Sequence, residues 1–83
     1  MASDLRSSGF VLESRGLNGH MIYRVWATES RMYQYTAPKH QDAEALERSR
    51  TYACADLQRQ ITEAGLTIAD LIPPTDPRGV TLK

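Results

Sequence analysis

An 83-residue chain of 9.3 kDa can bury one small hydrophobic core, so we expect a single domain. Its 41% hydrophobic and 24% charged residues are typical of a globular domain and exclude intrinsic disorder. The formal net charge of zero argues against a protein that binds nucleic acid through bulk positive charge.

The N-terminal residues 1–8 are small and polar without periodicity, and we expect them to form a loose leader. They contain no apolar stretch typical of a signal peptide, and no run of the chain approaches the roughly 18 apolar residues of a membrane-spanning helix. Cys54 is the one cysteine, so an intrachain disulfide is impossible. The sequence therefore predicts a cytoplasmic protein that makes no contact with a membrane.

Residues 10–36 are rich in β-branched and aromatic side chains, and Asn18-Gly19 is the strongest short-range signal for a β-hairpin. If these two residues are the centre of a type I′ turn, Leu12 lies opposite Val25 and Glu13 opposite Arg24. That register places two sets of side chains on opposite faces. One set is Val11, Glu13, Arg15, Leu17, His20, Ile22, Arg24 and Trp26, and the other is Phe10, Leu12, Met21, Tyr23, Val25 and Ala27.

A third antiparallel strand is expected over residues 31–36, after a polar break at residues 28–30, and Pro38 ends it. A two-residue loop would put Tyr33 and Tyr35 on the face of Trp26. A three-residue loop would put both tyrosines on the face of Tyr23 instead. The sequence leaves this facing open.

Residues 42–64 predict a long helix. Asp42 is a suitable N-cap, and Gly65 ends the helix with Leu66 packing back on Ile61. The apolar side chains form one stripe, made of Ala43, Leu46, Ala53, Cys54, Leu57, Ile61 and Ala64. We expect this stripe to cover the uniformly apolar face of the sheet.

Residues 65–72 fit either a short strand or a helical turn with Thr67 and Asp70 as a capping box, and we favour the turn. Three prolines within residues 73–83 predict an extended, flexible tail. The expected fold is therefore α+β. It is a three-stranded antiparallel meander with one long helix on one face, a short C-terminal turn and a Pro-containing tail, and residues 9–72 form the domain.

The sheet face away from the helix is the first candidate site, because no predicted element covers it. It carries Trp26, Ile22 and Val11 beside Arg15 and Arg24, and one of the two facings adds Tyr33 and Tyr35. A large aromatic among arginines is typical of a protein-binding hot spot. The alternatives are a C-terminal segment folded across this face, or surface hydrophobes with no role.

We also expect a homodimer, because a small domain with an open sheet edge and an exposed patch commonly pairs through a two-fold axis. Nucleic acid is the alternative partner, since aromatic and arginine side chains on a sheet can stack bases and bind phosphates. Residues 1–41 hold five basic and three acidic residues, whereas residues 42–66 hold three and five. This imbalance is weak for nucleic-acid binding, so we favour protein.

The helix carries the second group of candidates. Arg50 falls inside the apolar stripe and needs a counterion, either a local carboxylate such as Glu47 or one from a second chain in a dimer seam. Tyr52 lies on the opposite side with Arg48 and Arg59. Those three residues could recognise a partner, but they also fit the ordinary exterior of a helix, which we favour.

Nothing in the sequence indicates catalysis or a cofactor. His20, His40 and Cys54 lie far apart without a metal-binding motif, no phosphate-binding loop occurs, and Cys54 at the edge of the apolar stripe is typical of an inert thiol. The sequence therefore predicts a non-enzymatic, cofactor-free protein-binding module: an adaptor, regulator or inhibitor of another protein. The alternatives are a nucleic-acid-binding regulator and a small oligomeric enzyme.

Overall fold

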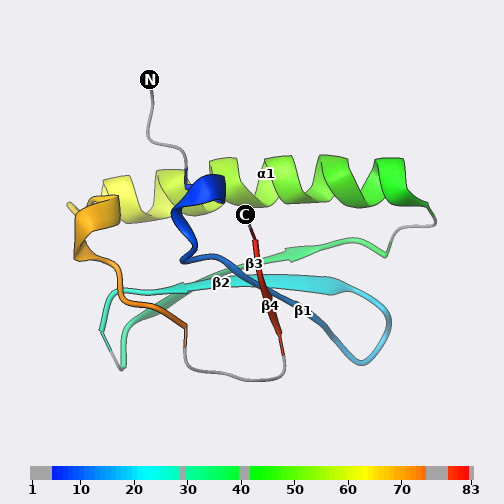
Figure 1. Ribbon diagram of the computed structural model, residues 1–83, viewed down its shortest axis with the longest axis horizontal. Coiled ribbons are helices and arrows are strands. Elements are labelled where there is room, and N and C mark those ends of the chain that lie inside the picture. The colour runs from blue at the N-terminus through cyan, green and yellow to red at the C-terminus, as the bar shows by residue number, and fades with distance from the viewer. Residues whose placement is uncertain (1–4, 29, 40–41, 75–78, 83) are drawn as a thin grey trace.

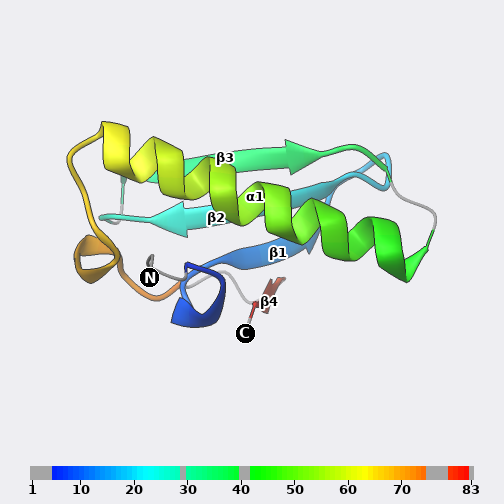
Figure 2. The ribbon, with the colours of Figure 1, turned by 90° about the horizontal axis from the view of Figure 1, so that it is seen from above.

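The computed structural model describes residues 5–28, 30–39, 42–74 and 79–82. Within these ranges a four-stranded antiparallel sheet carries one long helix on one face (Figure 1). The strands are β1 (Leu12–Arg15), β2 (Met21–Trp26), β3 (Met32–Ala37) and β4 (Val80–Thr81), and their order in the sheet is β3-β2-β1-β4. Helix α1 (Ala43–Glu63) crosses the sheet diagonally (Figure 2). The predicted α+β fold, a meander with one long helix packed against it, is confirmed, and β4 adds a fourth strand.

The pairing of β1 with β2 is one residue away from the predicted register. Leu12 lies opposite Arg24 and Glu13 lies opposite Tyr23. Because side chains alternate between faces, this shift turns every β1 side chain to the other side of the sheet. Val11, which precedes β1, is consequently buried in the core beneath α1.

The loop of this hairpin explains the shift. The amide of Gly16 donates to the carbonyl of His20 at 2.7 Å, and the amide of Gly19 donates to the carbonyl of Gly16 at 3.2 Å. Residues 17–19 therefore form a three-residue loop that ends in the left-handed conformation of Gly19, at φ +82°. Asn18 does not share the positive φ that a type I′ turn requires, so the predicted turn type is wrong.

The pairing of β2 with β3 decides between the two facings that the sequence left open. Tyr35 lies opposite Tyr23, and Tyr33 lies opposite Val25. The amide of Ala27 donates to the carbonyl of Arg31 at 2.9 Å, which joins the end of β2 to the start of β3. Both tyrosines of β3 therefore share the sheet face with Tyr23, on the side of α1.

Helix α1 begins and ends as predicted. The Asp42 carboxylate accepts a hydrogen bond from the amide of Ala45 at 2.8 Å. At the other end, Gly65 follows the helix and the amide of Leu66 donates to the carbonyl of Ile61 at 2.8 Å, the pattern of a Schellman motif. The predicted turn after the helix is also present as the 3-10 helix η2 (Ile68–Asp70), where the amide of Thr67 donates to the Asp70 carboxylate.

One hydrophobic core fills the space between α1 and the sheet. Its fully buried members come from the centre of the helix stripe and from alternate positions of the strands, including Val11, Tyr23, Val25, Ala53, Leu57 and Ile61. Leu46 and Cys54 pack against its edge, and Ala43 and Ala64 at the helix ends are exposed. The predicted stripe is thus confirmed for its central turns.

Both ends of the chain contribute more than the sequence suggested. In the expected leader, Leu5 is buried in the core and Arg6 begins the short 3-10 helix η1 (Arg6–Ser8), while residues 1–4 lie outside the described ranges. In the expected tail, β4 pairs with β1 and Leu82 is buried. Residues 75–78 and 83 are not among those described. The described parts of both ends therefore pack on the domain rather than extending from it.

Candidate functional site: the outer face of the sheet

The sheet face opposite α1 is formed by alternate residues of β1, β2 and β3. From β2 and β3 it receives Ile22, Arg24, Trp26, Met32, Gln34 and Thr36, which we call the outer patch. Trp26 lies opposite Met32, and Met32 is 40% exposed. The Arg24 guanidinium donates from Nε to the side-chain oxygen of Gln34 at 3.0 Å. The outer patch thus combines an aromatic ring, a thioether, and one guanidinium held in place across two strands.

The C-terminal segment covers the β1 side of this face. Leu12, which shares the face with the outer patch, is only 2% exposed. The reason is Gly79: a Cβ placed on it would lie 2.7 Å from Cγ of Leu12, so the backbone rests directly on the leucine side chain. Farther along, the amide of Ile72 donates to the carbonyl of Trp26 at 2.9 Å. Among the described C-terminal residues, Gly79 thus lies against this face at Leu12, whereas Ile72 and β4 pair with the backbones of the strands.

Four of the seven residues predicted for the partner surface lie elsewhere. Val11 is fully buried and Arg15 is exposed on the α1 side, because the register differs from the predicted one. Tyr33 and Tyr35 are half-buried on the same side. The structure brings Ile22, Arg24 and Trp26 together on the outer face and adds Met32, which the sequence did not single out because it falls in a strand whose facing was open.

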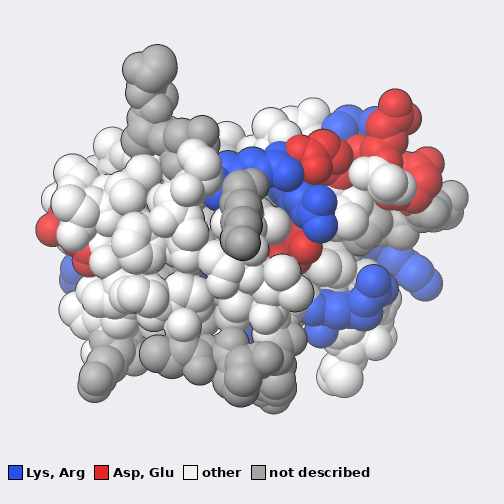
Figure 3. Space-filling model, in the orientation of Figure 1, with Lys and Arg blue, Asp and Glu red and all other residues white. Residues whose placement is uncertain are grey.

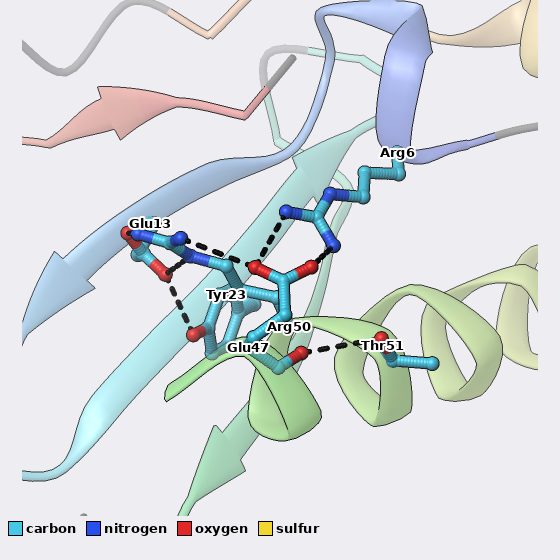
Figure 4. A network of polar contacts seen from close by, with 6 residues as sticks. All are labelled: Arg6, Glu13, Tyr23, Glu47, Arg50 and Thr51. Carbon is cyan, nitrogen blue, oxygen red and sulfur yellow. Dashed lines mark hydrogen bonds and ion pairs between the residues drawn. The ribbon is translucent and has the colours of Figure 1, made fainter. Parts of the chain in front are cut away.

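A polar network that contains the buried Glu13 and Tyr23 lies between β1, β2 and α1 (Figure 4). Glu13 is only 7% exposed, and its two carboxylate oxygens accept from Nε and the terminal nitrogen of Arg50 at 2.8 and 3.0 Å. The Tyr23 hydroxyl donates to the same carboxylate at 2.7 Å. Glu47 lies 3.5 Å from Arg50 and is also bound by the Arg6 guanidinium. Arg50 therefore finds its counterions, Glu13 and Glu47, within its own chain.

The electrostatic interactions of this network have a structural role. Burial, followed by the hydrogen bond to Glu13, raises the pKa of the Tyr23 hydroxyl well above its ordinary value. The hydrogen bond to Glu13 also raises the pKa of Arg50, and the bond from Arg6 lowers the pKa of Glu47. Each group is thereby held in the protonation state that it has at neutral pH. The Glu13–Tyr23 pair was missed because the predicted register placed these two side chains on opposite faces.

The remaining helix candidates lie on the exposed side of α1. Tyr52 is 63% exposed. Arg59 forms ion pairs with Asp56 at 2.8 Å and with Glu63 at 3.1 Å, and Arg48 lies 4.0 Å from Glu44. Pairs of this kind between neighbouring helical turns are ordinary on a solvated helix.

An open hollow of about 480 Å³ lies between the end of β3 and the first half of α1. Its lining residues are Tyr35, Pro38, Lys39, Asp42, Ala45, Arg48, Ser49 and Tyr52. Two of them are tyrosines, one from the sheet and one from the helix, so the hollow has aromatic side chains on two sides. The predicted helix residues Arg48 and Tyr52 are thus brought next to Tyr35, a proximity that the sequence did not indicate.

The charged side chains do not form a broad basic surface on the face seen in Figure 3. There, residues of both signs lie next to one another around the N-terminal half of α1 and the hairpin, and the other half of this face is mostly uncharged. Within the described ranges no three His, Cys, Asp or Glu side chains come together as a metal site requires. His40 lies outside those ranges. None of the described helices has the length and apolar character needed to cross a membrane.

Comparison of the chain with models of protein families, with curated proteins and with solved structures found no match.

Proposed function

We propose that this protein is a small, non-enzymatic protein-binding module that acts as an adaptor, regulator or inhibitor through the outer patch. The observation that carries this proposal is the opposition of Trp26 and Met32 on the sheet face away from α1, beside Arg24. Trp and Arg are the residue types that most often dominate the binding energy of protein interfaces, and Met adapts to an apolar partner surface.

The charge of the outer patch favours protein over nucleic acid. Arg24 is its one cation, and Arg15, the second arginine expected there, lies on the other side of the sheet. A surface that binds nucleic acid normally neutralises several phosphates at once. A single guanidinium beside the three apolar side chains Ile22, Trp26 and Met32 instead resembles the centre of a protein interface with a polar rim.

A cytoplasmic location is part of the proposal. It rests on Cys54, the one cysteine of the sequence, which packs at the edge of the core and has no second cysteine with which to form an intrachain disulfide. Proteins without disulfides are typical of surroundings that keep thiols reduced.

The proposal is tested by affinity capture from the native host, with the wild-type protein and two charge variants as baits. Met32→Glu introduces a carboxylate into the outer patch at an exposed position. Leu17→Glu is the matched control, because Leu17 is fully exposed in the hairpin loop and the variant adds the same charge away from the outer patch. Each bait is used with and without nuclease, and circular dichroism confirms that both variants fold.

The proposal requires a protein that the wild-type and Leu17→Glu baits retain, that Met32→Glu loses, and that nuclease does not release. Retention of nucleic acid, or release of every captured protein by nuclease, would support the nucleic-acid alternative. Equal capture by Met32→Glu and Leu17→Glu would remove the outer patch from the interface.

A further inference from the structure

Strand β3 lies at an edge of the sheet, and alternate peptide groups of this strand point away from β2. The Ala27–Arg31 pair is joined by a backbone hydrogen bond, so the pairs at every second position, such as Val25–Tyr33 and Tyr23–Tyr35, are the hydrogen-bonded ones. The amides and carbonyls of Met32, Gln34 and Thr36 therefore face the open edge. The Gln60 side chain reaches the carbonyl of Gln34 at 3.1 Å, which agrees with this direction.

This edge lacks the features that usually keep sheet edges from pairing. Natural edge strands are short, charged, bulged or interrupted by proline. At the opposite edge, β4 has only two residues. In contrast, β3 has six residues in continuous register with β2, and none of Met32–Ala37 is charged or proline. Among the described residues, only the Gln60 side chain bonds to an outward group of β3.

The chemistry of the strand is self-complementary. In an antiparallel pairing of two copies with Gln34 opposite Gln34, Met32 of each copy lies opposite Thr36 of the other. Every outward amide and carbonyl of these three residues then has a partner. A two-fold axis at Tyr33 would leave Thr36 opposite Ser30, outside the strand. An axis at Tyr35 would place Met32 opposite Pro38, which has no amide hydrogen.

The hollow beside β3 fits the same register. With Gln34 opposite Gln34, Tyr33 of one copy lies opposite Tyr35 of the other, on the α1 side of the joined sheet. Side chains at directly opposed positions lie close enough for aromatic contact. Tyr35 lines the hollow, and neither the Tyr35 hydroxyl nor the Tyr52 hydroxyl has a hydrogen-bond partner among the described residues. The second copy thus supplies an aromatic neighbour next to an open, tyrosine-lined space.

We propose that two copies of this chain form a dimer by antiparallel pairing of β3 with β3, with Gln34 opposite Gln34, so that the two sheets become one. The two-fold axis is perpendicular to the sheet, so both helices lie on one side and both outer patches on the other. Gln60 keeps its second hydrogen bond, to Asp56 at 2.7 Å, when the carbonyl of Gln34 is taken by the partner. The inference goes beyond the proposed function, because the dimer forms whether or not the outer patch binds a protein.

Sedimentation of two variants tests the pairing. Gln34→Pro removes the outward amide at the centre of the edge and leaves the pairing with β2 intact, because this amide does not face β2. Gln34→Thr is the control that changes the same side chain and keeps the amide. We expect wild type and Gln34→Thr to sediment at about twice 9.3 kDa at micromolar concentration, and Gln34→Pro to sediment as a monomer. Circular dichroism confirms that each variant is folded.

Cysteine cross-linking tests the register in a Cys54→Ala background. Gln34→Cys places two thiols at directly opposed positions, within the Cα separation that a disulfide accepts. Thr36→Cys places them several residues apart along the strands. We expect mild oxidation to cross-link Gln34→Cys and not Thr36→Cys. A wild-type monomer at hundreds of micromolar, a Gln34→Pro dimer, or equal cross-linking of the two cysteine variants would overturn the proposal.

Discussion

Replacing Arg50 with methionine removes the two guanidinium donors to the buried Glu13 carboxylate and keeps most of the side-chain stem. The Glu13 side chain is only 7% exposed. After Arg50→Met, the Tyr23 hydroxyl is the one donor of the described network that still binds the Glu13 carboxylate. Breaking a buried ion pair by removing one partner costs about 3–5 kcal/mol. Because the Arg50 side chain is itself 27% exposed, water weakens the pair, and we expect a smaller loss than this, about 2–3 kcal/mol.

Glu13→Gln is the matched comparison, and we expect it to be milder, at about 1 kcal/mol. The amide oxygen still accepts from Tyr23, and Arg50 keeps Glu47 at 3.5 Å as a counterion. The double variant should lose less than the sum of the two single variants, because no uncompensated buried charge remains.

Urea unfolding followed by circular dichroism measures these differences, and thermal melts check them. For a domain of this size, a loss of about 2–3 kcal/mol corresponds to a lower Tm of roughly 10–20 °C. If Arg50→Met proved less destabilising than Glu13→Gln, or if the double variant lost as much as the sum of the two, the description of Glu13 as a buried charge that depends on Arg50 would be wrong.

Three further outcomes follow from named contacts. Gly19→Val should destabilise the fold by about 1–3 kcal/mol in urea melts, because the loop holds this residue at φ +82°, and wild-type stability would contradict the loop assignment. The Arg6 guanidinium holds the pKa of Glu47 below its usual value, so this pair stabilises the fold above about pH 4.3, and the stabilisation is lost as the pH falls through the lower pKa of the folded state. Glu47→Gln should therefore flatten the acid side of the curve of unfolding free energy against pH. A curve that Glu47→Gln leaves unchanged would refute the pairing. Burial raises the pKa of Tyr23, so the unfolded chain loses this proton first and the fold should become less stable above about pH 10. An ultraviolet titration should show one of the four tyrosines ionising only when the protein unfolds. This last ionisation step should be absent in Tyr23→Phe.

The sequence predicted the elements whose signals are local. The N-cap of Asp42, the Schellman motif at Gly65 and the central helix stripe depend on residues within a few positions of each other, and all three are confirmed. The position of the first hairpin was also right. Its register was wrong because Asn18-Gly19 fits both a type I′ turn and a three-residue loop with only Gly19 left-handed, and the apolar pattern of β1 is too short to decide between them.

The composition of the candidate site depended on that one-residue choice. With Glu13 opposite Tyr23, the carboxylate points toward α1 and meets Arg50, whose place within the apolar stripe had already required a counterion. A search for that counterion among strand residues would have favoured the observed register. The role of residues 79–82 could not be predicted, since Gly79 against Leu12 and the two-residue β4 are contacts between distant parts of the chain with no local pattern.

The central claim is that the outer patch binds protein through apolar contact. It is tested most directly by the dissociation constant of the complex with the captured partner, measured between about 50 and 200 mM salt for wild type, Trp26→Ala and Arg24→Ala. We expect Trp26→Ala to weaken binding by about 2 kcal/mol or more, roughly 30-fold, at every salt concentration, and Arg24→Ala to have a smaller effect. A steep salt dependence in wild type that Arg24→Ala lowers by about one unit of slope, with little effect of Trp26→Ala, would contradict the claim and indicate a nucleic-acid partner.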